Sequence, residues 1–415
     1  MKRVAITGMG CVTPIGNSVA EFREALYAGR SGIAAFDTNF AGALTPDPGL
    51  RFKTAAKVKG FDAAQHFASG LIASMDSSAQ FAVVAARQAA QENGLTQHYD
   101  PADIAIITGC ACGGRAADEE ANRHLYTRNA RIHPMAIVRT MSSGGASNIA
   151  IDLGIGGPVL NIGTACASGT HAIGLAFQMV RAGIAPAAIA GGYEAPLTFG
   201  FLRAWDSMRV VSPTACRPFA ADRDGMTLGE GAAMLVLEPM DAAVARGARI
   251  YAEVVGFGMS ADAHHITQPR AEGAALAMRR ALEDAAAAGI EDAASRVGYI
   301  NAHGTGTPTN DAVEAAAIHQ AFGEFAGQIP VSATKSLTGH SIGATGAMEA
   351  MATAMALDAG SLPHTAGVSE VDRTLGLDVI VGGPRAMDAR RDIALSNSLA
   401  FGGLNAVIAL RRYAG

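Results

Sequence analysis

The feature that most constrains the fold of this chain is one structural pattern that the sequence repeats in its two halves. In each copy a helix with amphipathic spacing ends at a glycine, a short apolar strand follows, and a loop rich in glycine or threonine comes next. The copies are Gln80–Asn93, Ile104–Thr108 and Gly109–Gly114 in the first half, and Ala274–Ala288, Val297–Ile300 and His303–Thr307 in the second. A repeat unit of this size is well above solenoid periods and therefore indicates an internal duplication.

The likeness between the halves continues downstream of these segments. In both halves a strand leads into a turn and a helix of small residues, and one more apolar strand follows. The segments are Leu160–Thr164, a helix from Ser168 and Ala187–Ala190 in the first half, and Val331–Thr334, a helix from about Ser341 and Ile393–Leu395 in the second. Helices that alternate with buried strands predict a layered α/β fold. We expect two similar halves, residues 1–250 and 251–415, in one compact body, because no low-complexity linker separates them.

Composition and charge argue against several other kinds of protein. The 415 residues are 49% hydrophobic, and the net charge of −5 argues against binding nucleic acid by neutralising phosphates. We expect no membrane span, and Met1–Gly8 fits a first strand better than a signal peptide. The five cysteines show no disulfide spacing, and Cys110 and Cys112 have no second pair at zinc spacing. These features favour a reducing cytosol and no metal site.

Cys166 is the first candidate for chemistry. It lies where a strand ends and a small-residue helix begins, in the segment Asn161–Gly174. A thiol at a helix N-terminus lies near the positive end of the helix dipole, which favours the reactive thiolate. The geometry parallels the nucleophile elbow of hydrolases. A buried structural cysteine is the alternative that this segment alone leaves open.

Two histidines occupy similar positions. His303 follows a strand inside a Gly/Thr loop, and His340 precedes a helix in a loop that also contains Lys335. A cation beside an imidazole keeps the ring neutral, so that it can accept or share a proton. Glu349 lies two turns into the next helix and could balance the charge of Lys335. The alternatives are a turn histidine bonded to backbone and a solvated Lys–Glu pair.

The loop within Ser396–Asn405 is the fourth candidate, because its glycine pair could present backbone N–H groups to an oxyanion. All four candidates follow strand ends in the two halves. In layered α/β folds such ends converge on one site, so we expect them to lie together.

At these residues the sequence resembles the β-ketoacyl-acyl-carrier-protein synthases, the KAS I/KAS II branch of the thiolase-fold condensing enzymes. The resemblance extends over nearly the whole chain. Its most specific motifs are Thr164–Ser168, His303–Pro308 and Lys335-x-x-x-Gly339-His340. It implies a duplicated five-layer α-β-α-β-α body, a homodimer, and a decarboxylative Claisen condensation in fatty-acid or polyketide/polyene-type biosynthesis.

The resemblance also implies a role for each site residue. Cys166 would take an acyl group from a carrier protein, and malonyl-acyl-carrier protein would then lose CO2 and attack the resulting thioester. His303 and His340 would stabilise the enolate oxygen, and Lys335 would tune His340 or hold the site. The N–H groups of Cys166 and Phe401 would form the oxyanion hole, with Phe401 also the gate, and Thr305 and Thr307 would bind the phosphopantetheine arm. No resident cofactor, nucleotide or metal is expected.

Departures from the family pattern bear on specificity. Ala400 replaces a glycine of the gate, Trp205 falls where a pocket Phe is usual, and Cys112 falls in the loop near the acyl-chain floor. We expect a reshaped acyl pocket that favours flat, branched or unsaturated chains.

Residues 60–86 contain no Lys or Arg, although relatives often dock the carrier protein there. Arg209 matches a docking position, and Arg123, Arg128 and Arg131 form a second candidate patch. Solvated surface charge is the alternative for each of them.

Other functions fit less well. A dinucleotide-binding loop fails because Thr13 replaces its third glycine. A coenzyme A thiolase would need a second cysteine loop near the C-terminus, and a cysteine hydrolase has no use for two loop histidines and Lys335. A non-catalytic chain-length factor typically lacks the nucleophile. A heterodimer with such a partner subunit stays open.

Overall fold

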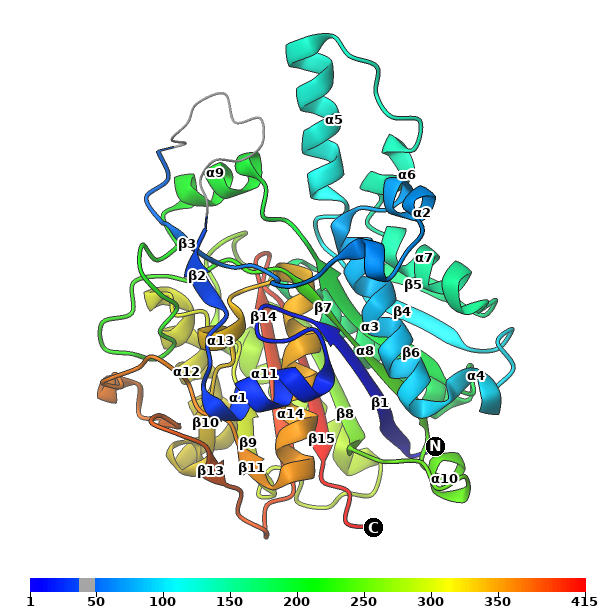
Figure 1. The fold of residues 1–415 in the computed structure, drawn as a ribbon. Coiled ribbons are helices and arrows are strands. Elements are labelled where there is room, and N and C mark those ends of the chain that lie inside the picture. Colours follow the sequence, from blue (N-terminus) through cyan, green and yellow to red (C-terminus); the bar gives the residue numbers. More distant parts are fainter. Residues whose placement is uncertain (37–48) are drawn as a thin grey trace.

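A computed structural model describes residues 1–36 and 49–415 (Figure 1). Within these ranges the largest sheet is mixed and has the strand order β12-β10-β9-β14-β15-β8-β1-β7-β6-β4-β5. The strands are β1 (Val4–Val12), β4 (Ala105–Gly109), β5 (Val159–Ile162), β6 (Ala188–Glu194), β7 (Gly231–Pro239), β8 (Ala252–Ala261), β9 (Val297–Asn301), β10 (Pro330–Ser332), β12 (Asp378–Val379), β14 (Ile393–Ala400) and β15 (Leu404–Arg411). No helix in the described ranges has the length and apolar character needed to cross a bilayer.

The sheet divides into two halves that sandwich a pair of helices. The halves meet where β1 pairs with β8 over Val4–Ile6 and Ala252–Val254. Helices α8 (Ser168–Ala182) and α14 (Thr345–Ala359) pack between them. The outer faces are covered by α3 (Ser77–Asn93) and α7 (Gly144–Leu153) on one side, and by α11 (Ala271–Ala287) and α12 (Pro308–Phe322) on the other. These are the five α-β-α-β-α layers that were predicted, and the fold class is confirmed.

The two central helices show why the layers hold together. Every residue of α14 from Thr345 to Leu357 is buried, as expected for a helix that is apolar on all sides. One hydrophobic core takes residues from α8, α14 and both halves of the sheet. The N-terminal turns of α8 and α14 lie deep in the body, and side chains placed there are shielded from water.

The duplication is visible in the segments that lead into these helices. A 3₁₀ turn precedes each one, η2 (Ala165–Ala167) before α8 and η4 (Ile342–Ala344) before α14, and both helices are 15 residues long. Ala165 and Ile342 have φ angles of 49° and 45° at the first position of these turns. Side chains with a Cβ rarely adopt such angles, and the packing around the two turns must hold them there.

Predicted element boundaries differ from the structure in identifiable ways. The helix expected over 80–93 begins at Ser77, because Asp76 caps it by accepting a hydrogen bond from the N–H of Ser78. The helix expected from about Ser341 begins only at Thr345, because the η4 turn comes first. The division of the chain near residue 250 stays a prediction.

Smaller helices and strand pairs lie around this body. Helix α5 (Arg115–Arg128) projects from it, and α9 (Phe199–Met208) lies near the top in Figure 1. The others are α1 (Val19–Ala28), α2 (Ser69–Ser74), α4 (Leu95–His98), α6 (Ala136–Thr140), α10 (Met240–Ala245), α13 (Lys335–Thr338), η1 (Ala63–Gln65), η3 (Gly323–Gln328), η5 (Arg373–Leu375), and the strand pairs β2 (Ile33–Ala35) with β3 (Thr54–Ala56) and β11 (Ser361–Leu362) with β13 (Arg385–Ala386).

The close contact between α8 and α14 gives a stability prediction. A Cβ on Gly346 would lie 2.0 Å from Thr170 Oγ1 and 3.0 Å from its backbone nitrogen. We expect Gly346→Ala to lower the free energy of unfolding by about 1–3 kcal/mol in a denaturant titration. Gly70→Ala is the control, because no atom lies within 4 Å of that Cβ and alanine favours the helix. Equal stability of the two variants would contradict the packing described here.

Candidate active site

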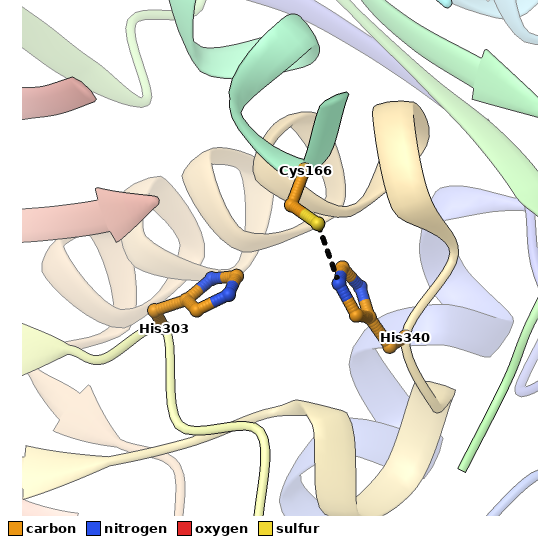
Figure 2. Close-up of side chains that lie close together, drawn as sticks. All are labelled: Cys166, His303 and His340. Carbon is orange, nitrogen blue, oxygen red and sulfur yellow. Dashed lines mark hydrogen bonds between the residues drawn. The ribbon is translucent and has the colours of Figure 1, made fainter. Parts of the chain in front are cut away.

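Three reactive side chains from the two halves meet at the buried ends of the central helices. Cys166 comes from η2, His303 follows β9, and His340 follows α13 (Figure 2). His340 Nε2 lies 3.0 Å from Cys166 Sγ, and the two imidazole rings are 5.5 Å apart between centroids at 86°. The three were predicted to converge, and the structure brings them together.

The turn that presents Cys166 is fixed by its neighbour Ser168. The Ser168 hydroxyl accepts a hydrogen bond from the N–H of Thr164 at 2.9 Å and donates one to the carbonyl of Ala165 at 2.7 Å. These two bonds span the residue with positive φ. The turn therefore presents Cys166 at the N-terminal end of α8.

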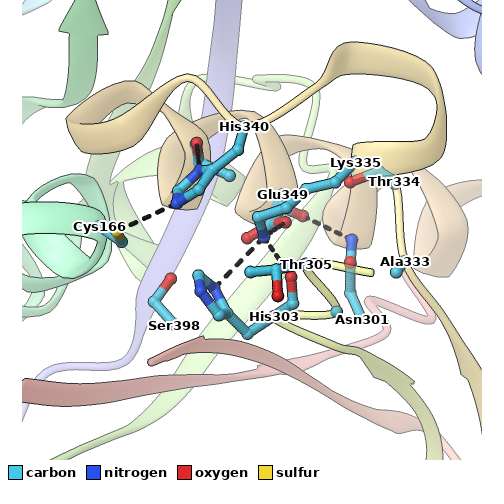
Figure 3. Close-up of polar contacts among 12 residues, drawn as sticks. Cys166, Asn301, His303, Thr305, Ala333, Thr334, Lys335, His340, Glu349 and Ser398 are labelled. Carbon is cyan, nitrogen blue, oxygen red and sulfur yellow. Dashed lines mark hydrogen bonds and ion pairs between the residues drawn. The ribbon is translucent and has the colours of Figure 1, made fainter. Parts of the chain in front are cut away.

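Lys335 is the charged group of the site, and it is fully buried. Its Nζ lies 2.5 Å from Glu349 Oε1 and 3.3 Å from His303 Nδ1, and it donates to the carbonyl oxygen of His303 (Figure 3). The side chains of Lys335 and Glu349 are both 0% exposed. The alternative of a solvated surface pair is therefore wrong. A buried ammonium needs such partners, because an unpaired one costs several kcal/mol.

Both imidazoles are neutral at pH 7. Burial lowers the pKa of His303 and of His340 well below the usual value, and the charge of Lys335 lowers both further. This agrees with the prediction that the Lys335 cation, in the loop of His340, keeps the imidazole neutral. Each ring can therefore accept or donate one hydrogen bond at each nitrogen according to its tautomer.

Burial decides the protonation state of Cys166. Burial raises the pKa of the Cys166 thiol to about 11, and this outweighs Lys335 and the backbone N–H groups of Phe401 and Cys166, which lower it. The helix N-terminus favours the thiolate, as expected, but desolvation outweighs this effect. The resting side chain is a thiol, and His340 Nε2 is the nitrogen placed to receive its proton.

The backbone N–H groups of Cys166 and Phe401 both act on the sulfur and lower the pKa of the thiol. Phe401 lies in the turn between β14 and β15, where Gly402 and Gly403 have φ angles of 84° and 68°. The turn is tied to a neighbouring loop, since Gly402 N donates to Ile266 O at 2.7 Å. These two N–H groups are the ones predicted to form an oxyanion hole, and they lie at the reactive atom.

A cavity of about 200 Å³ opens onto the three side chains. Thr305 and Thr307, predicted to bind the phosphopantetheine arm, line it, and their hydroxyls are 2.9 Å apart. Its wall also includes Trp205, Val210, Met226, Ile266, Asn310, Ala400 and Phe401. The cavity gives a bound group access to Cys166.

The sulfur of Cys166 and the ring nitrogens of His303 and His340 could also be ligands of a metal ion. They lie within 4.8 Å of one another, and thiol and imidazole are zinc ligands. The buried Lys335 ammonium beside them disfavours a further cation. We therefore interpret the cluster as catalytic.

Comparison with known proteins settles the family. The model of the β-ketoacyl synthase N-terminal domain matches residues 1–243, and that of the C-terminal domain matches residues 251–369. The chain belongs to the β-ketoacyl synthase family. This confirms the resemblance, and the chain is accordingly a condensing acyltransferase.

Curated relatives and solved structures agree with this assignment. Nodulation protein E of a Rhizobium sp. is 39% identical over 99% of both chains, and 3-oxoacyl-[acyl-carrier-protein] synthase 2 of a Synechocystis sp. is 40% identical over 99% of this chain and 98% of its own. Among structures, the ishigamide ketosynthase/chain length factor has a TM-score of 0.91 at 35% identity over 99% of both chains. A β-ketoacyl synthase from Burkholderia phymatum has a TM-score of 0.89 at 34% identity over 100% of both. A ketosynthase solved with its type II PKS acyl-carrier protein and bound to the hexaketide has a TM-score of 0.87 at 30% identity over 99% of both.

Of the three residues predicted to shape the acyl pocket of this β-ketoacyl synthase, Trp205 and Phe401 line the cavity and Cys112 does not. The rings of Trp205 and Phe401 stack with centroids 5.8 Å apart and 18° between their planes, and both line the cavity. Cys112 packs in an apolar cluster that also contains Trp205, Val210 and Met226 of the cavity wall. Trp205 therefore forms part of the wall between the nucleophile and the region around Cys112.

The predicted docking arginines lie away from the three reactive side chains. Arg209 is exposed at the end of α9, directly before Val210 of the cavity wall. Arg123 and Arg128 lie on α5, and Arg131 follows it. None of the four lines the cavity within the described part of the chain.

Two polar residues near the site, Glu194 and Thr345, were not predicted from the sequence. Glu194, at the end of β6, accepts hydrogen bonds from the N–H groups of Ala111, Cys112 and Gly343, and so ties the Cys112 loop to the η4 turn. Thr345, the first residue of α14, contacts His340. The available signals were a carboxylate ending an apolar strand and a hydroxyl five residues after His340.

The protonation state of Cys166 gives a testable prediction. A thiol with a pKa of about 11 should be alkylated by iodoacetamide at a rate that rises about tenfold for each pH unit from 7 to 10, because the thiolate is the nucleophile. Mass spectrometry of the Cys166 peptide gives the rate, with Cys166→Ala as the blank. A rate that levels off near pH 8 would contradict the buried thiol.

Proposed function

We propose that this chain condenses an acyl thioester carried on Cys166 with malonyl-acyl-carrier protein, giving 3-oxoacyl-acyl-carrier protein and CO2. The observation that carries the proposal is the 3.0 Å contact between a buried thiol and the Nε2 of a neutral histidine, with a second neutral histidine beside it. Membership of the β-ketoacyl synthase family supports the same reaction.

In the first half-reaction the thiol attacks the carbonyl carbon of an acyl thioester on the carrier's phosphopantetheine arm. The thiol proton moves to His340 Nε2, a carbon–sulfur bond forms, and charge develops on the carbonyl oxygen. The N–H groups of Cys166 and Phe401 are placed to stabilise that charge. As the intermediate collapses, the bond to the pantetheine sulfur breaks and that sulfur takes the proton from His340.

In the second half-reaction the malonyl group loses CO2, and the electron pair of the broken bond moves into an enolate. His303 is suited to stabilise the enolate oxygen. Its Nδ1 faces the Lys335 ammonium, which can only donate, so Nε2 carries the ring proton. The enolate carbon then attacks acyl-Cys166, a carbon–carbon bond forms, and the carbon–sulfur bond breaks. The Cys166 sulfur leaves as a thiolate and takes a proton from water, which His340 Nε2 can relay.

The reaction as proposed uses the chain's own residues and the phosphopantetheine arm that the carrier protein brings. Thr305 and Thr307 would hold the arm along the cavity. The exposed Arg209 beside the cavity wall is the docking residue that we favour, while Arg123, Arg128 and Arg131 stay predictions. A cytosolic location is part of the proposal, since free thiols at all five cysteines fit a reducing compartment.

The two half-reactions provide the test. Incubation with acyl-carrier protein should place the acyl group on Cys166, seen as a mass increase that Cys166→Ala lacks. His303→Ala should still be acylated but should condense with malonyl-acyl-carrier protein about 10²- to 10³-fold more slowly, because one donor to the enolate is lost. The proposal fails if wild-type chain accepts no acyl group, or if His303→Ala condenses at the wild-type rate.

We also propose that the chain forms a homodimer through the β5 side of the sheet. β5 is an edge strand of the described sheet, and the neighbouring α6 and α7 carry apolar side chains that face solvent. Leu160, Ile137 and Ile151 are 48%, 76% and 77% exposed. An unpaired apolar edge of this kind indicates an interface. The nearby arginines of α5 fit the rim of such an interface.

The dimer proposal is tested by charging this surface. Ile151→Asp combined with Leu160→Asp should convert a dimer into a monomer in size-exclusion chromatography with light scattering, because burying two carboxylates without partners is costly. Phe325→Asp is the matched control, since Phe325 is 57% exposed on η3. A wild-type chain that is monomeric alone would contradict the homodimer and favour pairing with a related subunit.

The stack of Trp205 on Phe401 supports a preference for flat, conjugated acyl chains. An acyl chain that displaces the Phe401 ring loses the stacking energy, and a planar conjugated chain against the indole restores it where a saturated chain does not. The sequence predicted a preference for flat, branched or unsaturated acyl chains. Of these, the stack favours the flat ones.

Substrate competition tests that preference. We expect the wild-type chain to take a conjugated dienoyl group from its carrier about two- to tenfold faster than the saturated group of equal length. Trp205→Leu should abolish the ratio, and Phe201→Leu should preserve it, because Phe201 contacts Trp205 but does not line the cavity. Equal rates for the two chains in the wild type would rule the preference out.

A further inference from the structure

His340 and His303 have different kinds of partner at Nδ1. His303 Nδ1 faces Lys335 Nζ, a group that has protons to donate and no lone pair to accept one. His340 Nδ1 faces the hydroxyl of Thr345 at 3.0 Å. A hydroxyl can accept as well as donate, so it allows a proton on His340 Nδ1 where the ammonium forbids one on His303.

The position of Thr345 makes this contact its main hydrogen-bonding option. Thr345 is 1% exposed and is the first residue of α14, and in the described ranges His340 Nδ1 is the partner that the structure shows for its hydroxyl. Thr353, further along the same helix, instead donates to the Glu349 carbonyl at 2.7 Å. The Thr345 hydroxyl is thus directed to the imidazole and not to its own helix.

We propose that Thr345 is a positioning residue that keeps the proton of His340 on Nδ1, so that Nε2 presents a lone pair to the Cys166 thiol. With Nδ1–H donating to Thr345 Oγ1, Nε2 can accept the thiol proton as sulfur bonds to the acyl carbon. The ring is then briefly protonated at both nitrogens, and Nδ1–H keeps its acceptor throughout. Nε2 gives the proton to the departing pantetheine sulfur, which restores the starting tautomer.

The consequence is a division of labour between two histidines. Thr345 makes His340 the proton acceptor of the acylation step, while Lys335 makes His303 the hydrogen-bond donor of the decarboxylation step. This inference rests on the proposed function, and it assigns the individual proton roles that the motif alone leaves open.

The two steps can be measured separately. Acylation of Cys166 is followed by mass spectrometry after mixing with acyl-carrier protein. For the second step each variant is first acylated to completion and isolated, and CO2 release is then measured after malonyl-acyl-carrier protein is added. Wild-type chain is the reference for both, and if it accepts no acyl group the proposed function fails rather than this assignment.

Thr345→Val removes the hydroxyl with little change of shape. A Nδ1–H without an acceptor in a buried site drives the proton to Nε2, so acylation should slow roughly 10- to 100-fold. The rate of CO2 release from the acyl-enzyme should stay at the wild-type value or rise, because the Nε2–H of His340 can then donate a second hydrogen bond to the enolate oxygen. Thr345→Ser should restore acylation to within about threefold, since it keeps the hydroxyl.

Thr353→Val is the matched control, because it removes a buried hydroxyl from the same helix without touching His340. It should leave the ratio of the two rates unchanged. The assignment is overturned if Thr345→Val acylates at the wild-type rate, if it slows both steps equally, or if Thr345→Ser fails to restore acylation.

Discussion

The buried ammonium of Lys335 is the interaction on which the site depends. It is fully enclosed, and Glu349, the His303 carbonyl and His303 Nδ1 surround it. Because the loss of one partner of a buried pair costs about 3–5 kcal/mol, α13, the loop after β9 and the central helix α14 are tied together at this point. Burial lowers the pKa of both histidines and the charge of Lys335 lowers it further. The same ammonium sets the tautomer of His303. One buried cation thus contributes to structure and to chemistry.

The duplicated fold explains how the other groups reach this cation. In each half a 3₁₀ turn leads directly into a central helix, and the first residue of that turn has a positive φ angle. In the first half that turn carries Cys166. In the second half His340 lies before it and Thr345 after it. Burial lowers the pKa of the imidazoles and raises the pKa of the thiol to about 11. Both shifts favour the neutral form of the side chain. A protonated thiol beside a neutral base is the result.

Much of this arrangement was predictable from the sequence, and the reasons are local. Cys166, His303 and His340 each follow a strand end, and the carboxyl ends of strands in a layered fold converge. Glu349 was named as the partner of Lys335 because two helical turns place it near. The start of a helix at Cys166 predicted one effect on the pKa of the thiol, but the depth of burial, which dominates that pKa, is not visible in the sequence. The Trp205–Phe401 stack and the Thr345–His340 contact depend on ring and hydroxyl orientations that only tertiary packing sets.

The two histidines of the site work as neutral rings. Nitrogen-15 NMR of histidine-labelled protein tests this most directly, with His303→Ala and His340→Ala used to assign the two rings. We predict that neither ring titrates between pH 6 and 8, and that the ring proton lies on Nε2 in His303 and on Nδ1 in His340. A titration of either ring near its usual pKa of about 6.5, or the same tautomer in both rings, would contradict the account.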